Sequence, residues 1–323
     1  MTAHNLSLTI FYFLFMYDLA IIGGGPAGVA AGVYASRKQL KTVFLTKEWG
    51  GQSVVSAEIQ NWIGTISISG EELAKQLKVH LEAYAGDLVT IVKDQCAVSI
   101  HQSGAGFSVG TDNGATYEAK TVLLCAGASR RKLDVLGAKE FDQKGLTYCA
   151  SCDGPLFGGQ DVVVIGGGNA GFETAAQLLA YAKSVTLLHH GDEFKADPVT
   201  VQKVLQNPKM KAILNAETVE VYGEGFVKGL KYKDKEANEV HDLPIAGIFV
   251  EIGIIPNTGF LNGLVELDKV GRIKVDGKSQ RSSIEGLWAA GDCSDALYHQ
   301  NNIAAGDAVK ALEDIYLYIK AAK

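Results

Sequence analysis

Short apolar runs alternate with longer segments of helical character along most of the chain, and this alternation is typical of α/β proteins. The clearest apolar runs lie at 17–22 (YDLAII) and 160–165 (QDVVVI), and each leads directly into a glycine-rich turn. An alanine-rich segment follows each turn, which predicts helices over 26–37 and 169–182. Strand, turn and helix therefore follow one another twice in the same order.

The two strand-turn-helix units are copies of one pattern. Gly166 lies 143 residues after Gly23, and the match continues without a gap into a second apolar strand, at 41–46 and 184–189. A repeated unit of this kind builds an open parallel sheet with helices on its faces. We therefore predict an α/β fold with two doubly wound Rossmann-type domains.

Each copy contains the pattern G-x-G-x-x-G, as GGGPAG at 23–28 and GGGNAG at 166–171. The first glycine allows a tight bend, the second lets the backbone approach a pyrophosphate, and the third lets helix and strand pack closely. The diphosphate then sits at the helix N-terminus, where unpaired N–H groups face it. We predict two dinucleotide sites, held by Gly23, Gly25, Pro26, Ala27 and Gly28 in the first copy and by Gly166, Gly168, Asn169, Ala170 and Gly171 in the second.

Later apolar strands belong with the first copy. The run 121–127 (TVLLCAG) predicts a buried strand, and 286–292 (GLWAAGD) predicts another, which ends in an acid before a long helix at about 302–322. An acid at a strand end, followed by a helix N-terminus, suits the ribityl chain and pyrophosphate of FAD. We predict a discontinuous FAD-binding domain at 16–130 and 251–323, into which an NAD(P)H-binding-like domain at 131–250 is inserted.

Two polar residues after the first copy are candidates for the first dinucleotide. Glu48 stands 20 residues after Gly28, the separation at which an acid accepts hydrogen bonds from ribose hydroxyls in such folds. A solvated surface glutamate is the alternative. Asn61 lies in the stretch QNWIG at 60–64, where it is either a simple turn residue or a cofactor contact.

The composition is that of a globular protein, with 47% hydrophobic and 20% charged residues. A formal net charge of −6 without a basic stripe argues against nucleic acid or an anionic membrane surface as a partner. Five cysteines, an odd number without the spacing of a disulfide framework, fit a reducing compartment. We therefore expect a cytoplasmic protein.

The first 15 residues contain an apolar run, LSLTIFYFLF at 6–15. No Lys or Arg precedes it and no small-residue cleavage site follows it, so it does not fit a signal peptide. It is also too short to span a membrane as a helix. We expect Met16 to be the natural start and residues 1–15 to be an upstream translation artefact; an additional N-terminal arm is the alternative.

The stretch between the two copies contains a Cys-x-x-Cys pair, Cys149 and Cys152, followed by Asp153. Cysteines at this spacing can form a disulfide with each other, or half of a zinc site. The other cysteines, Cys96, Cys125 and Cys293, are scattered singly, which argues against a metal site. A pair of inert core cysteines is a further alternative, but an acid beside the second sulfur suits proton handling. We predict a redox-active pair with Asp153 as its acid.

With these motifs in place, the chain resembles the low-molecular-weight thioredoxin reductases over 16–323. Besides the two glycine turns, the matching motifs include GGQ at 50–52, CASCD at 149–153, IGIIPNT at 252–258 and AAGDC at 289–293. The chain is still more similar to the reductase part of alkyl hydroperoxide reductase flavoprotein subunits, through KGLTYCASCDGPLF at 144–157 and LNAETVEVYG at 214–223. That family carries additional N-terminal thioredoxin-like domains, which are not in this sequence, so we expect its electrons to leave to a separate protein.

The resemblance implies a homodimer with FAD in the discontinuous domain, NAD(P)H in the inserted domain, and a thioredoxin-like protein as the substrate. It also implies that Cys152 faces the flavin, that Cys149 attacks the partner disulfide, and that Asp153 protonates the leaving thiolate. Hinge segments are implied near 127–133 and 251–256. Further FAD contacts are implied for Gly51, Gln52, Asn61, Gly127, Gly291, Asp292 and Gln300.

The sequence departs from this pattern at the second nucleotide site. NADPH-using relatives carry arginines after the second strand, whereas this chain has HHGDEFK at 189–195. NADH-using relatives carry an acid at the strand end, where this chain has His189 as its candidate nucleotide contact. We favour NADH, or loosely selective NAD(P)H, because the pyrophosphate turn is intact. The alternatives are another donor, namely ferredoxin or a second flavin, and a non-enzymatic redox-sensing flavoprotein.

Overall fold

The computed structural model of the chain describes residues 16–56, 59–104 and 106–321. These residues divide into two compact units. The first unit contains the described residues up to Val54, Ser69–Ser129 and the described residues from Ile255 onward; the second contains the described part of Val55–Ile68 and Arg130–Ile254. The predicted N-terminal extension, residues 1–15, lies outside the described residues. Which nucleotide belongs to which unit remains a prediction.

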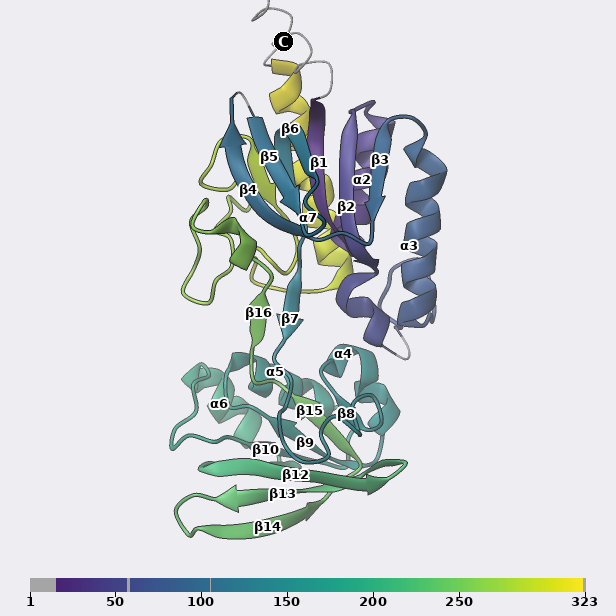
Figure 1. The fold of residues 1–323 in the computed structure, drawn as a ribbon. Helices are drawn as coiled ribbons and strands as arrows, with labels where there is room; N and C mark the ends of the chain where they lie inside the picture. Colours follow the sequence, from purple (N-terminus) through teal and green to yellow (C-terminus); the bar gives the residue numbers. More distant parts are fainter. Residues whose placement is uncertain (1–15, 57–58, 105, 322–323) are drawn as a thin grey trace, which may run out of the picture. The chain divides into compact units, whose positions relative to one another are not determined.

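The first unit is built around a seven-stranded sheet (Figure 1). Its strands are β1 (Tyr17–Gly24), β2 (Thr42–Trp49), β3 (Val89–Lys93), β4 (Ala97–Ser103), β5 (Gly106–Thr111), β6 (Thr116–Leu124) and β17 (Leu287–Ala289). They follow the order β3-β2-β1-β6-β5-β4, and β17 also pairs with β6. The pairs among β1, β2, β3, β6 and β17 are parallel, whereas β4, β5 and β6 pair antiparallel.

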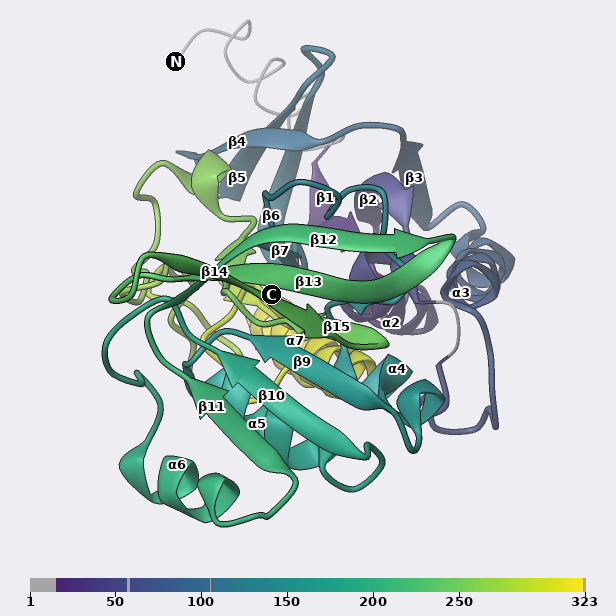
Figure 2. The same ribbon diagram turned by 90° about the horizontal axis from the view of Figure 1, so that it is seen from below.

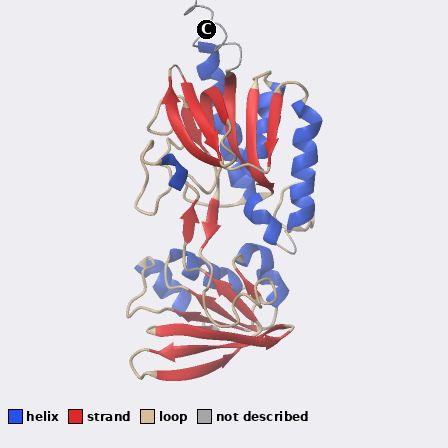
Figure 3. Cartoon of the chain, viewed as in Figure 1, coloured by secondary structure: helices blue, strands red, loops and turns tan. Residues whose placement is uncertain are grey.

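Three helices accompany this sheet, and Figure 3 shows them in blue beside the strands. They are α2 (Pro26–Arg37), α3 (Gly70–Ala85) and α7 (Asn301–Ala321), with short 3₁₀ turns η1 (Gly51–Val55) and η3 (Gly259–Leu261). α2 begins with Pro26 at its first turn and contacts β1, α3 and α7, which agrees with the predicted helix over 26–37. Ser69 caps α3 by accepting the N–H of Glu72 at 3.2 Å.

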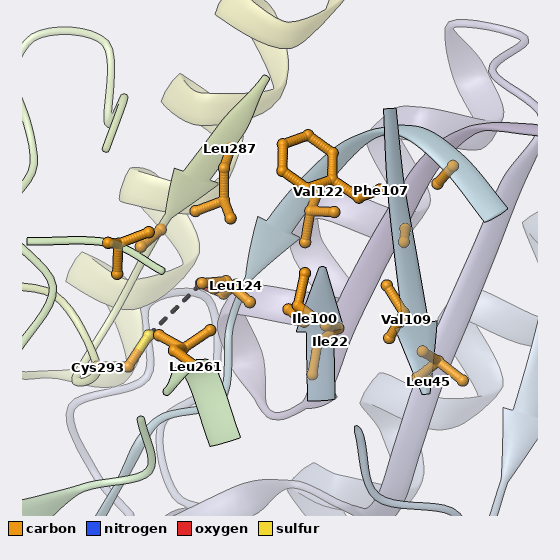
Figure 4. Close-up of a cluster of buried hydrophobic side chains, with 14 of the residues drawn as sticks. Ile22, Leu45, Ile100, Phe107, Val109, Val122, Leu124, Leu261, Leu287 and Cys293 are labelled. Atoms are coloured by element: carbon orange, nitrogen blue, oxygen red, sulfur yellow. Dashed lines mark hydrogen bonds between the residues drawn. The ribbon is translucent and has the colours of Figure 1, made fainter. Parts of the chain in front are cut away.

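A hydrophobic core lies between the parallel strands and the antiparallel β4–β5 pair (Figure 4). Ile22 of β1, Leu124 of β6 and Leu287 of β17 are all buried in it, together with Phe107 of β5. The thiol of Cys293 lies 3.5 Å from the carbonyl oxygen of Leu124. This packing holds β1, β6 and β17 side by side, and the carboxyl ends of such parallel strands form the edge where ligands bind in open α/β sheets.

The second unit contains a five-stranded parallel sheet, visible in Figure 2. Its strands are β8 (Leu146–Thr147), β9 (Asp161–Ile165), β10 (Ser184–Leu188), β11 (Met210–Ile213) and β15 (Gly247–Val250). The helices of this unit are α4 (Ala150–Asp153), α5 (Asn169–Leu178) and α6 (Pro198–Leu205), with a 3₁₀ turn η2 (Gly154–Phe157). The strand order is β11-β10-β9-β15-β8. Both sheets therefore confirm the predicted pair of Rossmann-type folds.

A three-stranded antiparallel sheet extends the second unit. It consists of β12 (Ala216–Glu224), β13 (Phe226–Asp234) and β14 (Glu239–Pro244), in that order. Its buried side chains, including Val221, Val227 and Leu230, join the core formed by β9 and β15. This sheet covers the parallel sheet with apolar side chains, while most of β14 stays exposed.

The predicted helix over 169–182 is four residues too long. α5 ends at Leu178, because the following N–H groups of Ala180 and Tyr181 bond to carbonyls only three residues earlier, at 3.2 and 3.0 Å. The Lys183 N–H then bonds to the Gln160 carbonyl at 2.9 Å instead of to the carbonyl of Leu179, so the helical pattern does not continue.

Two of the places where the chain passes from one unit to the other lie in short strands, β7 (Ala128–Arg130) and β16 (Ile254–Pro256), which pair with each other. They fall within the segments 127–133 and 251–256 that were predicted as hinges. None of the helices in the described parts of the chain combines the length and apolar character needed to cross a membrane.

Candidate active site

The first glycine turn connects β1 to α2 in the first unit. Gly23 has φ of +123°, and a Cβ there would overlap the carbonyl oxygen of Cys125. A Cβ at Gly28 would overlap the carbonyl oxygen of Gly23, so helix and strand approach as the motif requires. Gly25 is different, because a Cβ there would meet nothing nearer than the Gly51 Cα at 3.9 Å. The space in front of Gly25, at an uncapped helix N-terminus, is therefore open to a ligand.

The structure brings several of the predicted FAD residues together around this turn. Gly51 faces Gly25, and a Cβ at Gly291 would lie 3.5 Å from the Cβ of Ala27. Glu48 lies exposed near the end of β2, and its carbonyl accepts a hydrogen bond from Thr46 at 2.6 Å. Hence residues from three separate parts of the sequence meet at one glycine turn.

The other residues predicted to contact FAD have different surroundings. Gly127, with φ of +65°, is held by Asn257, whose N–H donates to the Gly127 carbonyl at 3.1 Å. Asp292 is half-buried and lies 3.3 Å from Nδ1 of His299. Gln52 is exposed in η1, Gln300 directly precedes α7, and Asn61 lies in the segment grouped with the second unit.

Sequence reasoning missed two polar residues that support this turn, Asn257 and Ser53. Asn257 also donates from its side chain to the Ala126 carbonyl at 2.8 Å, which orients the loop after β6. Ser53 donates to Asn301 at 2.9 Å, which joins η1 to the start of α7. The only signal for Asn257 was its place in the IGIIPNT motif, whereas nothing in the sequence pattern distinguishes Ser53.

The second glycine turn connects β9 to α5 and repeats the geometry of the first. Gly166 has φ of +131°, and a Cβ there would overlap the carbonyl oxygen of Glu251. A Cβ at Gly171 would overlap the carbonyl oxygen of Gly166. A Cβ at Gly168 would meet no atom within 4 Å, and Asn169 and Ala170 are exposed at the uncapped start of α5. This turn therefore also has the open helix N-terminus that a pyrophosphate requires.

The loop after β10 holds the second turn from one side. The Lys195 N–H donates to the Gly167 carbonyl at 2.8 Å, and the Asn169 side chain accepts the Asp197 N–H at the same distance. His189, at the strand end, is only 3% exposed, and its Nδ1 accepts the Gly167 N–H at 3.2 Å. His190 is exposed beside it. The structure thus places the predicted contact His189 beneath the turn rather than on its open side.

The redox pair lies between β8 and α5 in the second unit. Cys149 and Cys152 are joined as a disulfide, with Cα atoms 5.3 Å apart. Cys149 caps the short helix α4, and its sulfur accepts the Cys152 N–H at 3.2 Å. Both cysteines are half-buried, so each sulfur is close to the surface of the unit.

Asp153 is buried next to the pair, with 6% exposure. Its Oδ2 accepts a hydrogen bond from the Thr147 hydroxyl, and the same hydroxyl accepts the Cys149 N–H at 3.4 Å. Burial raises the pKa of the Asp153 carboxyl above its usual range, and the hydrogen bond from Thr147 offsets only part of this effect. Asp153 therefore keeps its proton to higher pH than an exposed aspartate and can act as an acid. Sequence reasoning missed Thr147, for which a polar residue in the buried strand β8 was the available signal.

The other cysteines do not join this pair. Cys125 and Cys293 are buried in the first unit, and burial raises the pKa of both thiols, that of Cys293 to about 11. A thiol with so high a pKa stays protonated and unreactive. Among the described residues, no three or more His, Cys, Asp or Glu side chains are grouped so that they could hold a metal ion.

The sequence comparisons agree with this arrangement. The family described as pyridine nucleotide-disulphide oxidoreductase matches residues 17–309. The F subunit of alkyl hydroperoxide reductase in Escherichia coli strain K12 is 39% identical over 304 residues, which cover 94% of this chain and 58% of that protein. A Bacillus subtilis strain 168 protein named NADH dehydrogenase is 39% identical over 303 residues, again covering 94% of this chain and 58% of the relative. The chain thus spans 58% of the length of these two relatives.

Solved structures of similar length match almost the whole chain. A thioredoxin reductase from Giardia duodenalis superposes with a TM-score of 0.87 at 32% identity, covering 94% of this chain and 99% of that one. The thioredoxin reductase of Streptococcus pyogenes gives a TM-score of 0.86 at 34% identity, covering 95% and 99%. FAD and NAD(P)H are the cofactors of this family, and the open cradles in front of Gly25 and Gly168 fit their pyrophosphates. The chain belongs to the pyridine nucleotide-disulphide oxidoreductase family.

Proposed function

We propose that the chain is an FAD-dependent thioredoxin-disulfide reductase, which passes electrons from NAD(P)H to a thioredoxin-like protein through the Cys149–Cys152 disulfide. The observation that carries the proposal is this disulfide beside Asp153, a buried carboxyl with a raised pKa, in a unit that also presents an open nucleotide turn. The thioredoxin reductases among its structural neighbours support the same reaction class. We further propose a cytoplasmic homodimer.

FAD, when bound, supplies the two electrons that reduce the disulfide to a dithiol. The Cys149 thiolate then attacks the partner disulfide, so that a mixed disulfide forms and the first partner sulfur leaves as a thiolate. Asp153 gives its proton to that leaving sulfur. Cys152 next attacks the Cys149 sulfur, which restores the internal disulfide and releases the second partner sulfur. The partner gains two electrons and the cysteine pair loses two, so the step is balanced.

Cys149 is assigned as the attacking sulfur because it begins α4, where the N–H of Cys152 already points at it. An N–H donor at a helix N-terminus stabilises a thiolate and lowers its pKa. Cys152, one turn later, is the resolving sulfur. The family resemblance supports the same division.

NADH is the favoured donor. The 189–195 loop has no arginine to bind a 2′-phosphate, and the His189 ring is buried and offers it no charge. A relative that is named NADH dehydrogenase supports this preference.

Anaerobic mixing of the yellow protein with NADH, NADPH and reduced ferredoxin, in separate stopped-flow experiments, tests the donor. We expect NADH to bleach the flavin band faster than NADPH does. Bleaching by reduced ferredoxin but by neither nicotinamide nucleotide would mean that ferredoxin, not NAD(P)H, is the donor. Cys149→Ser should keep flavin reduction and lose thioredoxin turnover. Cys96→Ser, at a half-buried cysteine outside the pair, is the matched control and should keep both. Thioredoxin turnover by Cys149→Ser would contradict the assigned roles.

A further inference from the structure

The His189 ring is enclosed between two glycines of the second unit. A Cβ at Gly167 would lie 2.8 Å from Nδ1 and 2.9 Å from the Cβ of His189, and a Cβ at Gly191 would lie 2.9 Å from Nε2. Any larger residue at either position would displace the imidazole. The two glycines therefore make room for a ring directly under the pyrophosphate turn.

The hydrogen bonds of this ring define its tautomer. Nδ1 accepts the Gly167 N–H at 3.2 Å, so Nδ1 cannot itself carry a proton. The proton of the neutral ring is then on Nε2, which is buried and lies toward the Glu193 carbonyl without a hydrogen bond of full geometry. The structure thus requires the neutral Nε2–H form.

Through this bond His189 controls the shape of the turn. Gly167 lies between Gly166 and Gly168, whose backbone shapes the pyrophosphate cradle. The Gly167 N–H is held by His189, and its carbonyl is held by the Lys195 N–H at 2.8 Å. The His189 ring and the loop after β10 therefore hold Gly167, the middle residue of the turn, by its N–H and by its carbonyl.

We propose that His189 is a positioning residue of the nicotinamide-nucleotide site, which holds the glycine turn in its binding shape only while its ring is neutral. A proton on Nδ1 would face the Gly167 N–H with a second donor, so the turn would be released and nucleotide affinity would fall. This inference rests on the proposed nicotinamide donor. If the ring acts in this way, the affinity of this chain for its nicotinamide donor falls as the pH falls.

The charged surroundings support a neutral ring at ordinary pH. Burial lowers the pKa of His189 most strongly, and the neighbouring His190 and Lys195 act in the same direction, whereas the Glu193 carbonyl and Asp192 oppose them. Lys235, from the β13–β14 hairpin, donates to the His190 carbonyl at 3.0 Å and adds another positive charge nearby. Because the pKa is lowered, the folded state binds this proton less readily than the unfolded chain. The stabilising contact is therefore complete above about pH 6.5 and is lost as the pH falls through the lower folded-state value.

Isothermal titration of the FAD-loaded protein with ADP-ribose and with NAD⁺ tests the proposal between about pH 8 and about pH 5. The wild-type protein should bind about three- to tenfold more weakly at the acid end, and binding there should release protons. Titrations in buffers of different ionisation enthalpy measure that release without any variant.

Three variants separate the hydrogen bond from the ring. His189→Asn keeps an acceptor near the position of Nδ1 and does not titrate, so it should bind nearly as tightly as wild type at about pH 8 and show a flat pH profile. His189→Ala should bind more weakly at every pH. His190→Asn, the matched control, should keep the loss of affinity on acidification, with its midpoint at the same or a higher pH because His190 lowers the pKa of His189.

Each failure has a distinct meaning. A wild-type profile that is flat, without proton release, overturns the role of His189 but leaves the proposed function in place. A profile of His189→Asn as steep as that of wild type overturns it as well. Absence of ADP-ribose and NAD⁺ binding at every pH overturns the nicotinamide donor itself, and this inference with it.

Discussion

Replacing Thr147 by valine should change the acidity of Asp153 without changing the shape of the site. The two side chains have nearly the same volume, and Thr147 is 4% exposed, so valine fits the position. The change removes the hydrogen bond from the Thr147 hydroxyl to Asp153, which opposes the effect of burial on the Asp153 pKa. We therefore expect the Asp153 pKa to rise further.

The size of the effect follows from the chemistry of the contact. A hydrogen bond to a charged group contributes about 1.5–3 kcal/mol, and one pKa unit corresponds to about 1.4 kcal/mol. Loss of this hydrogen bond in Thr147→Val should therefore raise the pKa of Asp153 by the amount that corresponds to this free energy. Because the acid form of Asp153 is the active one, the alkaline limb of its pH profile should move upward by the same amount.

The assay is the pH dependence of kcat/KM for a thioredoxin disulfide, with the nucleotide saturating. Thr147→Ser keeps the hydroxyl and should keep the wild-type limb. Asp153→Asn lacks the acid and should lower the rate by about 10²–10⁴. A Thr147→Val limb at the wild-type position, or at lower pH, would show that this hydroxyl does not set the acidity of Asp153.

Three other substitutions in the second unit have different expected outcomes. Burial raises the pKa of Glu251 despite Arg130 at 3.6 Å, so the folded state binds this proton more tightly and loses stability as the pH rises through the folded-state value. Glu251→Gln should therefore raise the melting temperature by about 2–4 °C at neutral pH and have no effect at about pH 4. Circular dichroism measures both melting temperatures. Destabilisation at neutral pH would mean that the ion pair with Arg130 outweighs the cost of burying the charge. Gly168→Ala should melt like wild type but bind NAD⁺ at least about tenfold more weakly, because the new methyl group enters the open cradle. Gly171→Ala should instead destabilise the unit by several kcal/mol, because its Cβ overlaps the Gly166 carbonyl; similar melting of the two alanine variants would contradict the distinction.

Much of the fold could be predicted because its strongest signals are local. A residue at the position of Gly23 must adopt positive φ beside the Cys125 carbonyl, and only glycine does so without strain, so the turn is visible in the sequence. The repeat of that turn 143 residues later indicated a second Rossmann unit in the same way.

Other features depend on contacts between distant residues. The inward position of His189 depends on Gly167 and Gly191, and neither glycine looks different from one that serves an ordinary turn. Thr147 has a role only because α4 brings Asp153 next to it, where the Thr147 hydroxyl donates a hydrogen bond to the Asp153 carboxyl. The sheet β12–β14 was not predicted, because exposed and charged residues interrupt the alternation of its strands, β14 above all.

The central claim is that electrons reach the disulfide of Cys149 and Cys152, and a count of thiols tests it directly. The protein is reduced anaerobically with NADH, and thiols that react with a chromogenic disulfide are counted per FAD before and after reduction. We predict about two additional thiols in wild type and none in Cys152→Ser. Full bleaching of the flavin without any gain of thiols in wild type would contradict the claim.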